Sequence, residues 1–252
     1  MQRSNASALR GLVVSDLHLF ARRSAGLEHM VALTPRLSES DLLVLNGDIF
    51  DFRWSTRSGH SESIREARHW LRGLIESAGR CQVHYVLGNH DCLVEFVPEL
   101  ERLANECPTF NWHQYTVQFG DALFLHGDCT TRRMDFDALQ KYRDYWSRDE
   151  QRHGPATVVY QMADRLGMTR LVHHLNFPRK RTLRRLTHHL DLTMKNWRES
   201  IRHCYFGHTH EPFSHVDHEG IRFHNTGCAI KGMRFGPAVF EVSDHTIGGR
   251  SA

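Results

Sequence analysis

Residues 203–210 read H-C-Y-F-G-H-T-H and join an apolar, strand-like run to two histidines separated by one residue. In an extended segment, side chains two positions apart project to the same side, so His208 and His210 are expected to point together. Two imidazoles at one place indicate a metal site, a proton relay or a coincidence, and the rest of the chain has to decide among the three.

Four other apolar runs end in the same way. Residues 12–14 lead into S-D-L-H-L, 42–45 into N-G-D, 83–87 into G-N-H-D, and 122–125 into H-G-D. Helical patterns lie between some of them, such as 63–78, where apolar residues fall on one helical face. This alternation predicts a layered α/β fold, in which ligands bind beyond the carboxyl ends of the strands. Each turn alone is ordinary turn chemistry, but five such ends indicate a functional edge.

Length and composition predict one soluble domain over residues 1–252. The six cysteines show no metal-binding spacing and are expected to be reduced thiols. No signal-peptide core and no run of ~20 apolar residues is present, so we expect a cytoplasmic protein, with peripheral contact at the inner membrane left open.

The ordered blocks resemble those of the calcineurin-like metallophosphoesterases, D-x-H, G-D, G-N-H-D/E, H and G-H-x-H. All five occur here in that order, as Asp16-Leu17-His18, Gly47-Asp48, Gly88-Asn89-His90-Asp91, His126 and Gly207-His208-Thr209-His210. The resemblance implies a four-layer α/β/β/α sandwich formed by a single domain, with a helical insertion, or lid, at about 130–202.

The resemblance also implies two divalent metal ions that clamp the oxygens around one phosphorus. Asp48 would be the carboxylate that bridges them. The other ligands would be Asp16, His18 and His210 for the first ion and Asn89, His126 and His208 for the second. Mixed nitrogen and oxygen ligands suit Mn, Fe or Zn better than Ca or Mg, and Mn is the expected ion.

Two further residues would act on the substrate by the same resemblance. His90 follows the expected ligand Asn89 and would protonate the leaving oxygen, a task that a near-neutral pKa suits. Asp51 lies three residues after Asp48 and would orient the His90 ring. The reaction implied is attack on phosphorus by a hydroxide that bridges the two metals.

A basic segment lies between the last two blocks. Residues 165–202 contain ten Lys or Arg and two Asp or Glu. Within it, one apolar helical stripe is expected, with Arg184 and Arg185 beside it as candidate substrate-binding residues. The stripe consists of Leu183, Leu186, Leu190, Met194, Trp197 and Ile201. A helix packed on the core, a lid over an anionic substrate and a surface for anionic lipid all remain open.

Length, motif spacing and the insertion, with F-D-A-L-Q-K-Y-R-D-Y-W at 136–146, are similar to those of a narrower family, the UDP-2,3-diacylglucosamine pyrophosphatases of lipid A synthesis. That resemblance implies a nucleotide-sugar substrate carrying lipid, cleaved to UMP and an acylated sugar phosphate. That family commonly has arginine where this chain has His90, and histidine there is the pattern of the broader superfamily.

Other phosphoesterase substrates stay open, namely a cyclic nucleotide, a dinucleoside polyphosphate, a phosphoprotein or a nucleic acid. A nucleic acid is disfavoured because the basic segment lacks an aromatic-rich platform on which bases could stack. A non-catalytic scaffold of phosphoesterase fold is disfavoured because all seven expected ligands are present.

Overall fold

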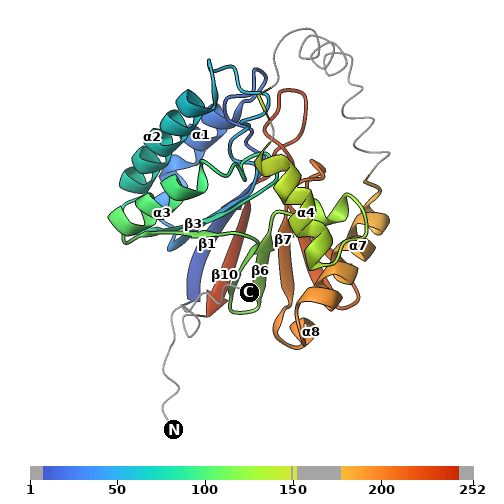
Figure 1. Cartoon of the computed structure of the whole chain (residues 1–252). Helices are drawn as coiled ribbons and strands as arrows, with labels where there is room; N and C mark the ends of the chain where they lie inside the picture. The colour runs from blue at the N-terminus through green and yellow to red at the C-terminus, as the bar shows by residue number, and fades with distance from the viewer. Residues whose placement is uncertain (1–7, 149, 152–176, 244–252) are drawn as a thin grey trace.

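The computed structural model describes residues 8–148, 150–151 and 177–243, and the chain folds around two five-stranded sheets (Figure 1). The first sheet has the order β10-β1-β2-β3-β4, in which β1 to β4 are parallel and β10 is antiparallel to β1. Its strands are β1 (Ala8–Val14), β2 (Leu42–Asn46), β3 (Gln82–Val86), β4 (Phe110–His113) and β10 (Ala238–Ser243). The helices that follow its first three strands are α1 (Gly26–Leu37), α2 (His60–Ala78) and α3 (Val97–Glu106).

The second sheet has the order β5-β6-β7-β9-β8, with β6, β7 and β9 parallel. Its strands are β5 (Thr116–Phe119), β6 (Ala122–Leu125), β7 (His203–Phe206), β8 (Phe213–His218) and β9 (Ile221–Asn225). The helices on this side are η1 (Asp128–Thr130), α4 (Phe136–Ser147), α7 (Arg179–Thr193) and α8 (Trp197–Ser200). Helices α4, α7 and α8 fall inside the region expected to form a helical insertion, at about 130–202, whereas η1 begins just before it. Residues 152–176 of that region lie outside the described residues.

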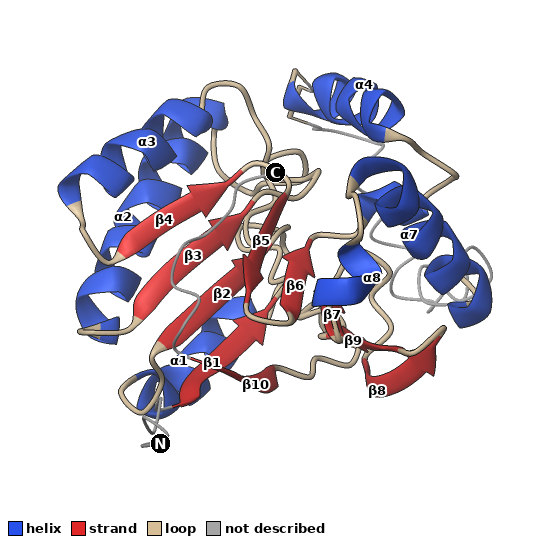
Figure 2. Ribbon diagram, turned by 90° about the horizontal axis from the view of Figure 1, so that it is seen from below, coloured by secondary structure: helices blue, strands red, loops and turns tan. Residues whose placement is uncertain are grey.

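Three apolar clusters show how these elements are layered. One joins the first sheet to α1, α2 and α3, a second joins the other sheet to α4, α7 and α8, and a third lies between the two sheets. Figure 2 shows the helices on the two outer faces with the strands between them. The expected four-layer α/β/β/α sandwich is therefore confirmed.

One buried side chain joins the two sheets where their strands end. The Asn46 amide, at the last residue of β2, donates to the carbonyl of Leu125 over 3.0 Å and to that of Tyr205 over 3.1 Å. Because β6 and β7 carry these carbonyls, the amide holds the carboxyl ends of three parallel strands close together. This is the edge at which ligands are expected.

The predicted stripe over residues 183–201 is buried except for the partly buried Met194, but it does not form one helix. Helix α7 ends at Thr193, Met194 is extended, and Asn196 has a left-handed φ of 54° before α8 begins. The indole Nε1 of Trp197 then donates to Asp191 over 2.9 Å. After the break, Trp197 packs in the same apolar cluster as α7. The apolar spacing in the sequence therefore continues across the end of a helix. None of the helices in the described ranges has the length and apolar composition needed to cross a bilayer.

Candidate metal centre

Five strand ends deliver polar side chains to one place at the carboxyl edge of the two sheets. The first sheet contributes residues that follow β1, β2 and β3, and the second sheet contributes residues that follow β6 and β7. All nine predicted metal-binding and catalytic positions lie there: Asp16, His18, Asp48, Asp51, Asn89, His90, His126, His208 and His210.

One part of this cluster is formed by residues after β1 and β7. His210 Nε2 lies 3.2 Å from Asp16 Oδ1 and 3.2 Å from His18 Nε2. The backbone N–H of His208 donates to both oxygens of Asp16, each over 3.0 Å. The Asp16 carboxylate therefore fixes the G-H-T-H turn while its Oδ1 faces the two imidazoles. These are the three side chains expected around the first ion.

A second part is formed by residues after β2, β6 and β7. His126 Nε2 lies 3.2 Å from Asp48 Oδ2, and its Nδ1 lies 3.3 Å from the carbonyl of Asn46. A carbonyl can only accept, so Nδ1 carries a proton, and Nε2, which faces Asp48, is the nitrogen that could bind a metal ion. The rings of His126 and His208 meet edge to face with centroids 5.2 Å apart. Asp48 has ligand atoms close to both halves of the cluster, which is where a bridging carboxylate has to lie.

The donor set fits divalent metal ions. Asn89 Oδ1 is buried and accepts no hydrogen bond from any residue in the described part of the chain. An orphaned buried acceptor costs about 1–3 kcal/mol, and a cation would satisfy it. Two buried carboxylates and four imidazoles around the same space offer the mixed oxygen and nitrogen ligands that first-row divalent ions bind.

The backbone at the expected ligands is unusual. Five of the seven have left-handed φ values although none is glycine: Asp16 51°, His18 46°, Asp48 51°, His208 64° and His210 57°. This conformation costs about 1–3 kcal/mol per residue and persists only where the surroundings impose it. Such strain is concentrated at functional sites, and here it turns each side chain out of its strand direction into the shared space.

Three glycines of the motifs are required by close approach. A Cβ at Gly47 would collide with the His126 ring, one at Gly88 with the Asp48 carboxylate, and one at Gly207 with the Asp16 carboxylate. Because a glycine has no side chain, each of these positions leaves room for an expected ligand from another strand. The G-D, G-N-H-D and G-H-T-H blocks are interlocked in this way.

Burial and the neighbouring charges shift the pKa values of Asp48 and His126 in opposite directions. Burial raises the pKa of Asp48, but the His126 and His90 imidazoles lower it well below its usual range. Burial lowers the pKa of His126, yet Asp48 raises it to about 9. For His208, burial and the neighbouring His126 lower the pKa to about 4. The carboxylates thus stay ionised and attract positive charge into a buried site, which is the electrostatic requirement for binding cations.

His90 and Asp51 lie beside the cluster, with Asp51 buried and His90 partly exposed. His90 Nδ1 is 3.1 Å from Asp51 Oδ1, and Asp51 Oδ2 is 3.3 Å from His18 Nδ1. Burial raises the pKa of Asp51, but the charges of His90 and His18 and their hydrogen bonds lower it, so its carboxylate stays ionised. The His90 ring contacts Trp146 of α4 with centroids 4.8 Å apart. The ring is therefore oriented through its Nδ1 side.

The neighbouring Asp91 has a structural role in the turn after β3. Its carboxylate accepts hydrogen bonds from the Gly88 N–H (2.7 Å), the Ile49 N–H (2.8 Å) and the Tyr85 hydroxyl (2.6 Å). These bonds join the turn after β3 to the turn after β2, so Asp91 holds the two loops that carry Asn89 and Asp48 in register.

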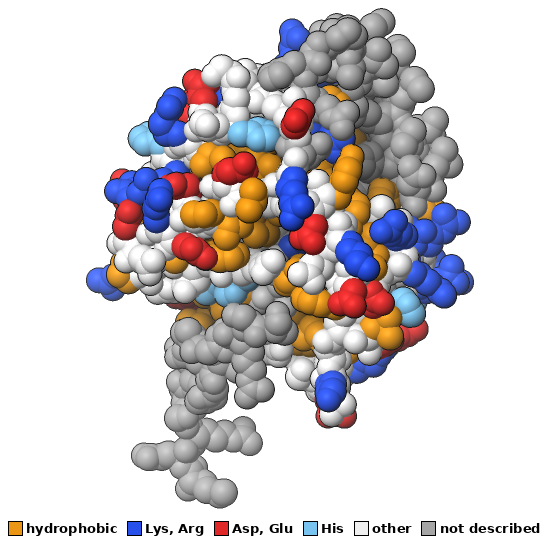
Figure 3. Space-filling model, viewed as in Figure 1, with side chains coloured by type: hydrophobic (Ala, Val, Ile, Leu, Met, Phe, Trp, Pro, Cys, Tyr) orange, Lys and Arg blue, Asp and Glu red, His pale blue; other side chains and the backbone are white. Residues whose placement is uncertain are grey.

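The two candidate substrate-binding arginines differ in their surroundings. The Arg185 guanidinium donates to the carbonyls of Thr130 (2.8 Å) and Thr131 (2.9 Å). The Thr131 hydroxyl in turn lies 2.8 Å from His208 Nε2, so Arg185 is two contacts from the cluster. Arg184 is exposed on α7. The exposed residues of α7 also include Arg179, Lys180 and Arg181. Figure 3 shows Lys and Arg side chains gathered on the right, the side on which Figure 1 places α7.

Sequence reasoning missed Cys228, which lies beside the first half of the cluster. Its Sγ and the ring nitrogens of His18 and His210 lie within 4.8 Å of one another. Burial raises the pKa of this thiol, but the His210 and His18 imidazoles lower it to about 7. No cysteine spacing could reveal it. The available signal was a sixth strand end, since β9 runs into N-T-G-C much as the other strands run into their polar turns.

Comparison with known proteins points to one family. The sequence model described as calcineurin-like phosphoesterase matches residues 9–212, most of the chain. A search of the curated proteins found no match.

The chain is also similar to solved structures. One is a phosphopantetheinyl hydrolase, PptH, from Mycobacterium tuberculosis, with 15% identity over 89% of this chain and 91% of that one, at a TM-score of 0.40. A second is Yfce, a phosphoesterase from E. coli, with 14% identity over 89% of this chain and 83% of that one, at a TM-score of 0.39. A third is a dimetal phosphatase from Danio rerio, with 13% identity over 94% of this chain and 93% of that one, at a TM-score of 0.46.

Proposed function

The chain belongs to the calcineurin-like phosphoesterase family, and from that premise we propose that it hydrolyses a phosphodiester or diphosphate bond at two metal ions, with His90 as general acid. The seven clustered ligands and the His90–Asp51 pair beside them support the proposal. Two divalent ions, when bound, polarise the phosphoryl oxygens and lower the pKa of water. Mn²⁺ is the proposed ion, with Fe or Zn as alternatives.

The protein's own residues have separable tasks in this reaction. Asp48 lies between the two halves of the cluster and would hold both ions at a fixed separation. His90 Nδ1 lies 3.1 Å from Asp51 Oδ1, and with the ring held in this way its Nε2 proton would be given to the departing oxygen. Asp51 stabilises the imidazolium that must exist before that transfer. The His90–Asp51 contact is the single observation that carries the assignment of the acid.

The substrate proposed is UDP-2,3-diacylglucosamine or a close analogue. The cluster is bordered by α4 and α7, of which α4 exposes Phe136 and Tyr145 while α7 exposes Arg184 and its basic neighbours. Apolar and cationic side chains on adjoining helices suit a ligand with acyl chains and phosphates. A substrate of this kind would hold the enzyme at the cytoplasmic face of the inner membrane, where cationic residues meet anionic headgroups.

The acid role is tested by varying the leaving group. His90→Ala is expected to lose about 10²–10⁴-fold in kcat on an alkyl phosphodiester, which needs protonation, and far less on a nitrophenyl phosphodiester, which does not. The exposed His69→Ala on α2 is the matched control and should leave both rates unchanged. Equal losses on the two substrates would show that His90 does not act as the acid.

The substrate is tested by UMP release from UDP-2,3-diacylglucosamine, with Mn²⁺-loaded and metal-stripped protein compared. Metal-dependent release is expected. If no UMP appears while the nitrophenyl phosphodiester is still cleaved, the substrate is wrong and the reaction class stands. If neither substrate is cleaved by protein that has bound two metal ions, the proposed activity is wrong.

A further inference from the structure

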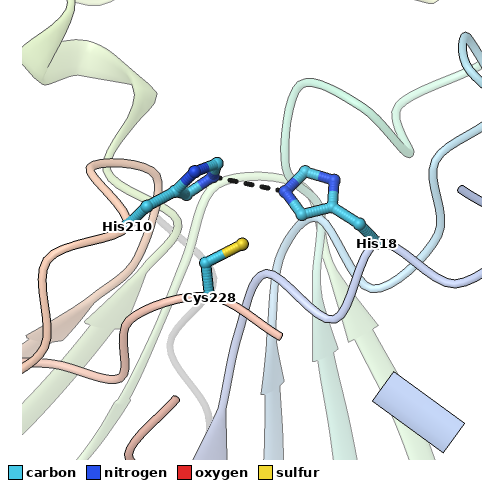
Figure 4. Close-up of side chains that lie close together, drawn as sticks. All are labelled: His18, His210 and Cys228. Atoms are coloured by element: carbon cyan, nitrogen blue, oxygen red, sulfur yellow. Dashed lines mark hydrogen bonds between the residues drawn. The ribbon is translucent and has the colours of Figure 1, made fainter. Parts of the chain in front are cut away.

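Cys228 is a buried thiol that is absent from all three apolar clusters. Cys81 and Cys92 pack in the cluster under the first sheet, and Cys129 and Cys204 pack under the second. Cys228 is equally buried but faces polar groups. Figure 4 shows its sulfur directed toward the space between the His18 and His210 rings. A cysteine that only filled a gap in the core would lie among aliphatic side chains.

The three side chains form a group of metal-ligand size. The Sγ of Cys228 and the ring nitrogens of His18 and His210 all lie within 4.8 Å of one another, and the two Nε2 atoms are 3.2 Å apart. Ligand atoms spaced in this way surround one ion whose bonds to nitrogen and sulfur are about 2.0–2.3 Å. Asp16 faces the same space through Oδ1, 3.2 Å from His210 Nε2.

The backbone around Cys228 is fixed on both sides. The Cys228 N–H donates to the Arg234 carbonyl over 3.0 Å, and the Ala229 N–H donates to the Asp16 carbonyl over 3.0 Å. Gly227 has a φ of 73°, and a Cβ there would collide with the Arg234 carbonyl. The turn after β9 is therefore built against the Asp16 loop, and this places the thiol at the cluster without freedom to swing away.

We propose that the Cys228 thiolate is an additional ligand of the ion held by Asp16, His18 and His210. The inference rests on the proposed function, because it concerns the first ion of that pair. On coordination the S–H bond breaks, a sulfur–metal bond forms and the proton is released to solvent. A thiolate is a soft ligand, so this position should favour Zn, Fe or Co over Mn more strongly than the second position, which has oxygen and nitrogen ligands only. The inference therefore predicts a mixed metal pair, with Zn, Fe or Co at the first position and the proposed Mn at the second.

The test uses the full chain loaded with Co²⁺, whose thiolate complexes absorb in the near ultraviolet by sulfur-to-metal charge transfer. The band is expected in the wild type, lost in Cys228→Ser, and kept in Cys81→Ser. Cys81 is the matched control because it is also buried but precedes β3, at the opposite edge of the sheet. In competition between Zn²⁺ and Mn²⁺, Cys228→Ser should weaken Zn²⁺ binding at least as much as loss of an outer partner does, about 10–100-fold, and Mn²⁺ binding less.

The outcomes separate the two proposals. If the wild type binds two Co²⁺ ions and cleaves the nitrophenyl phosphodiester but shows no charge-transfer band, the thiolate ligand is refuted and the enzyme activity stands. If no metal binds, both fall. Should Cys228→Ser fail to fold, X-ray absorption of the Zn-loaded wild type gives the answer without a variant. A sulfur neighbour at about 2.3 Å supports the proposal, and a shell of nitrogen and oxygen alone overturns it.

Discussion

A buried ion pair beside the metal cluster gives the sharpest stability prediction. Arg143 of α4 donates to both oxygens of Asp128, from Nε over 2.8 Å and from Nη2 over 3.0 Å. Both side chains are almost completely buried. Asp128 is two residues after His126, so this pair anchors α4 to the turn that carries an expected ligand.

Arg143→Met would leave the Asp128 carboxylate buried without its partner. Removing one member of a buried pair costs about 3–5 kcal/mol in the free energy of unfolding. With a urea m-value of about 3 kcal/mol per M, the unfolding midpoint should fall by about 1–2 M. The double variant Asp128→Asn, Arg143→Met removes the unpaired charge and should be more stable than Arg143→Met alone.

The loss should also depend on pH. Burial raises the pKa of Asp128, but Arg143 lowers it below the ordinary value, so in the wild type the pair stabilises the fold above about pH 4 and the contribution is lost as pH falls further. In Arg143→Met the buried carboxyl has a raised pKa, so the penalty is greatest near pH 7 and shrinks on acidification. Urea unfolding of the wild type and the variant at pH 7, pH 5 and about pH 3, with a chelator to remove metal linkage, measures both effects. A loss under 1 kcal/mol, or a double variant no more stable than the single one, would refute the reasoning.

Three further predictions follow from other parts of the site and fold. Gly207→Ala should abolish tight binding of the first metal, measured by metal content after dialysis, because its Cβ meets the Asp16 carboxylate, whereas Gly73→Ala on the open face of α2 should bind metal normally. Burial lowers the pKa of His84 to about 3 and of His113 to about 4, so the unfolded chain binds more protons below pH 6.5 and the unfolding free energy should decrease as pH falls from 6.5 to 4; a flat profile for thermal unfolding would contradict this. Arg184→Gln should raise KM for an anionic lipid-linked substrate and leave kcat unchanged, and an unchanged KM would remove Arg184 from the substrate site.

The metal cluster could be predicted because its chemistry is written in short motifs. Each block supplies a ligand type, and three of the blocks begin with a glycine. Because the strand ends of parallel sheets meet at one edge, order along the chain was enough to bring residues as distant as Asp16 and His210 together. The need for glycine at these positions could not be explained from the sequence, because it depends on which side chain of another strand fills the space beside each glycine.

Other features depend on packing that no local pattern records. Cys228 is brought to the cluster by the pairing of β9 with β7, which the sequence does not specify. The end of α7 was missed because apolar spacing continued across Asn196, and a left-handed residue there has no periodic signal. The Arg143–Asp128 pair joins residues 15 apart through a turn and a helix, and composition alone makes both look like surface charges.

The closest ligand contacts run from one sheet to the other. Asp48 after β2 meets His126 after β6, and Asp16 after β1 meets His210 after β7, each at 3.2 Å. The separation of the two proposed ions would therefore depend on how the two sheets pack on the layer that contains Phe124 and Tyr205. A change of volume in that layer would retune the reaction rate from a distance. The exposed residues of α4 and α7 lie outside that layer, so substitutions there would change the proposed substrate without altering how the sheets pack.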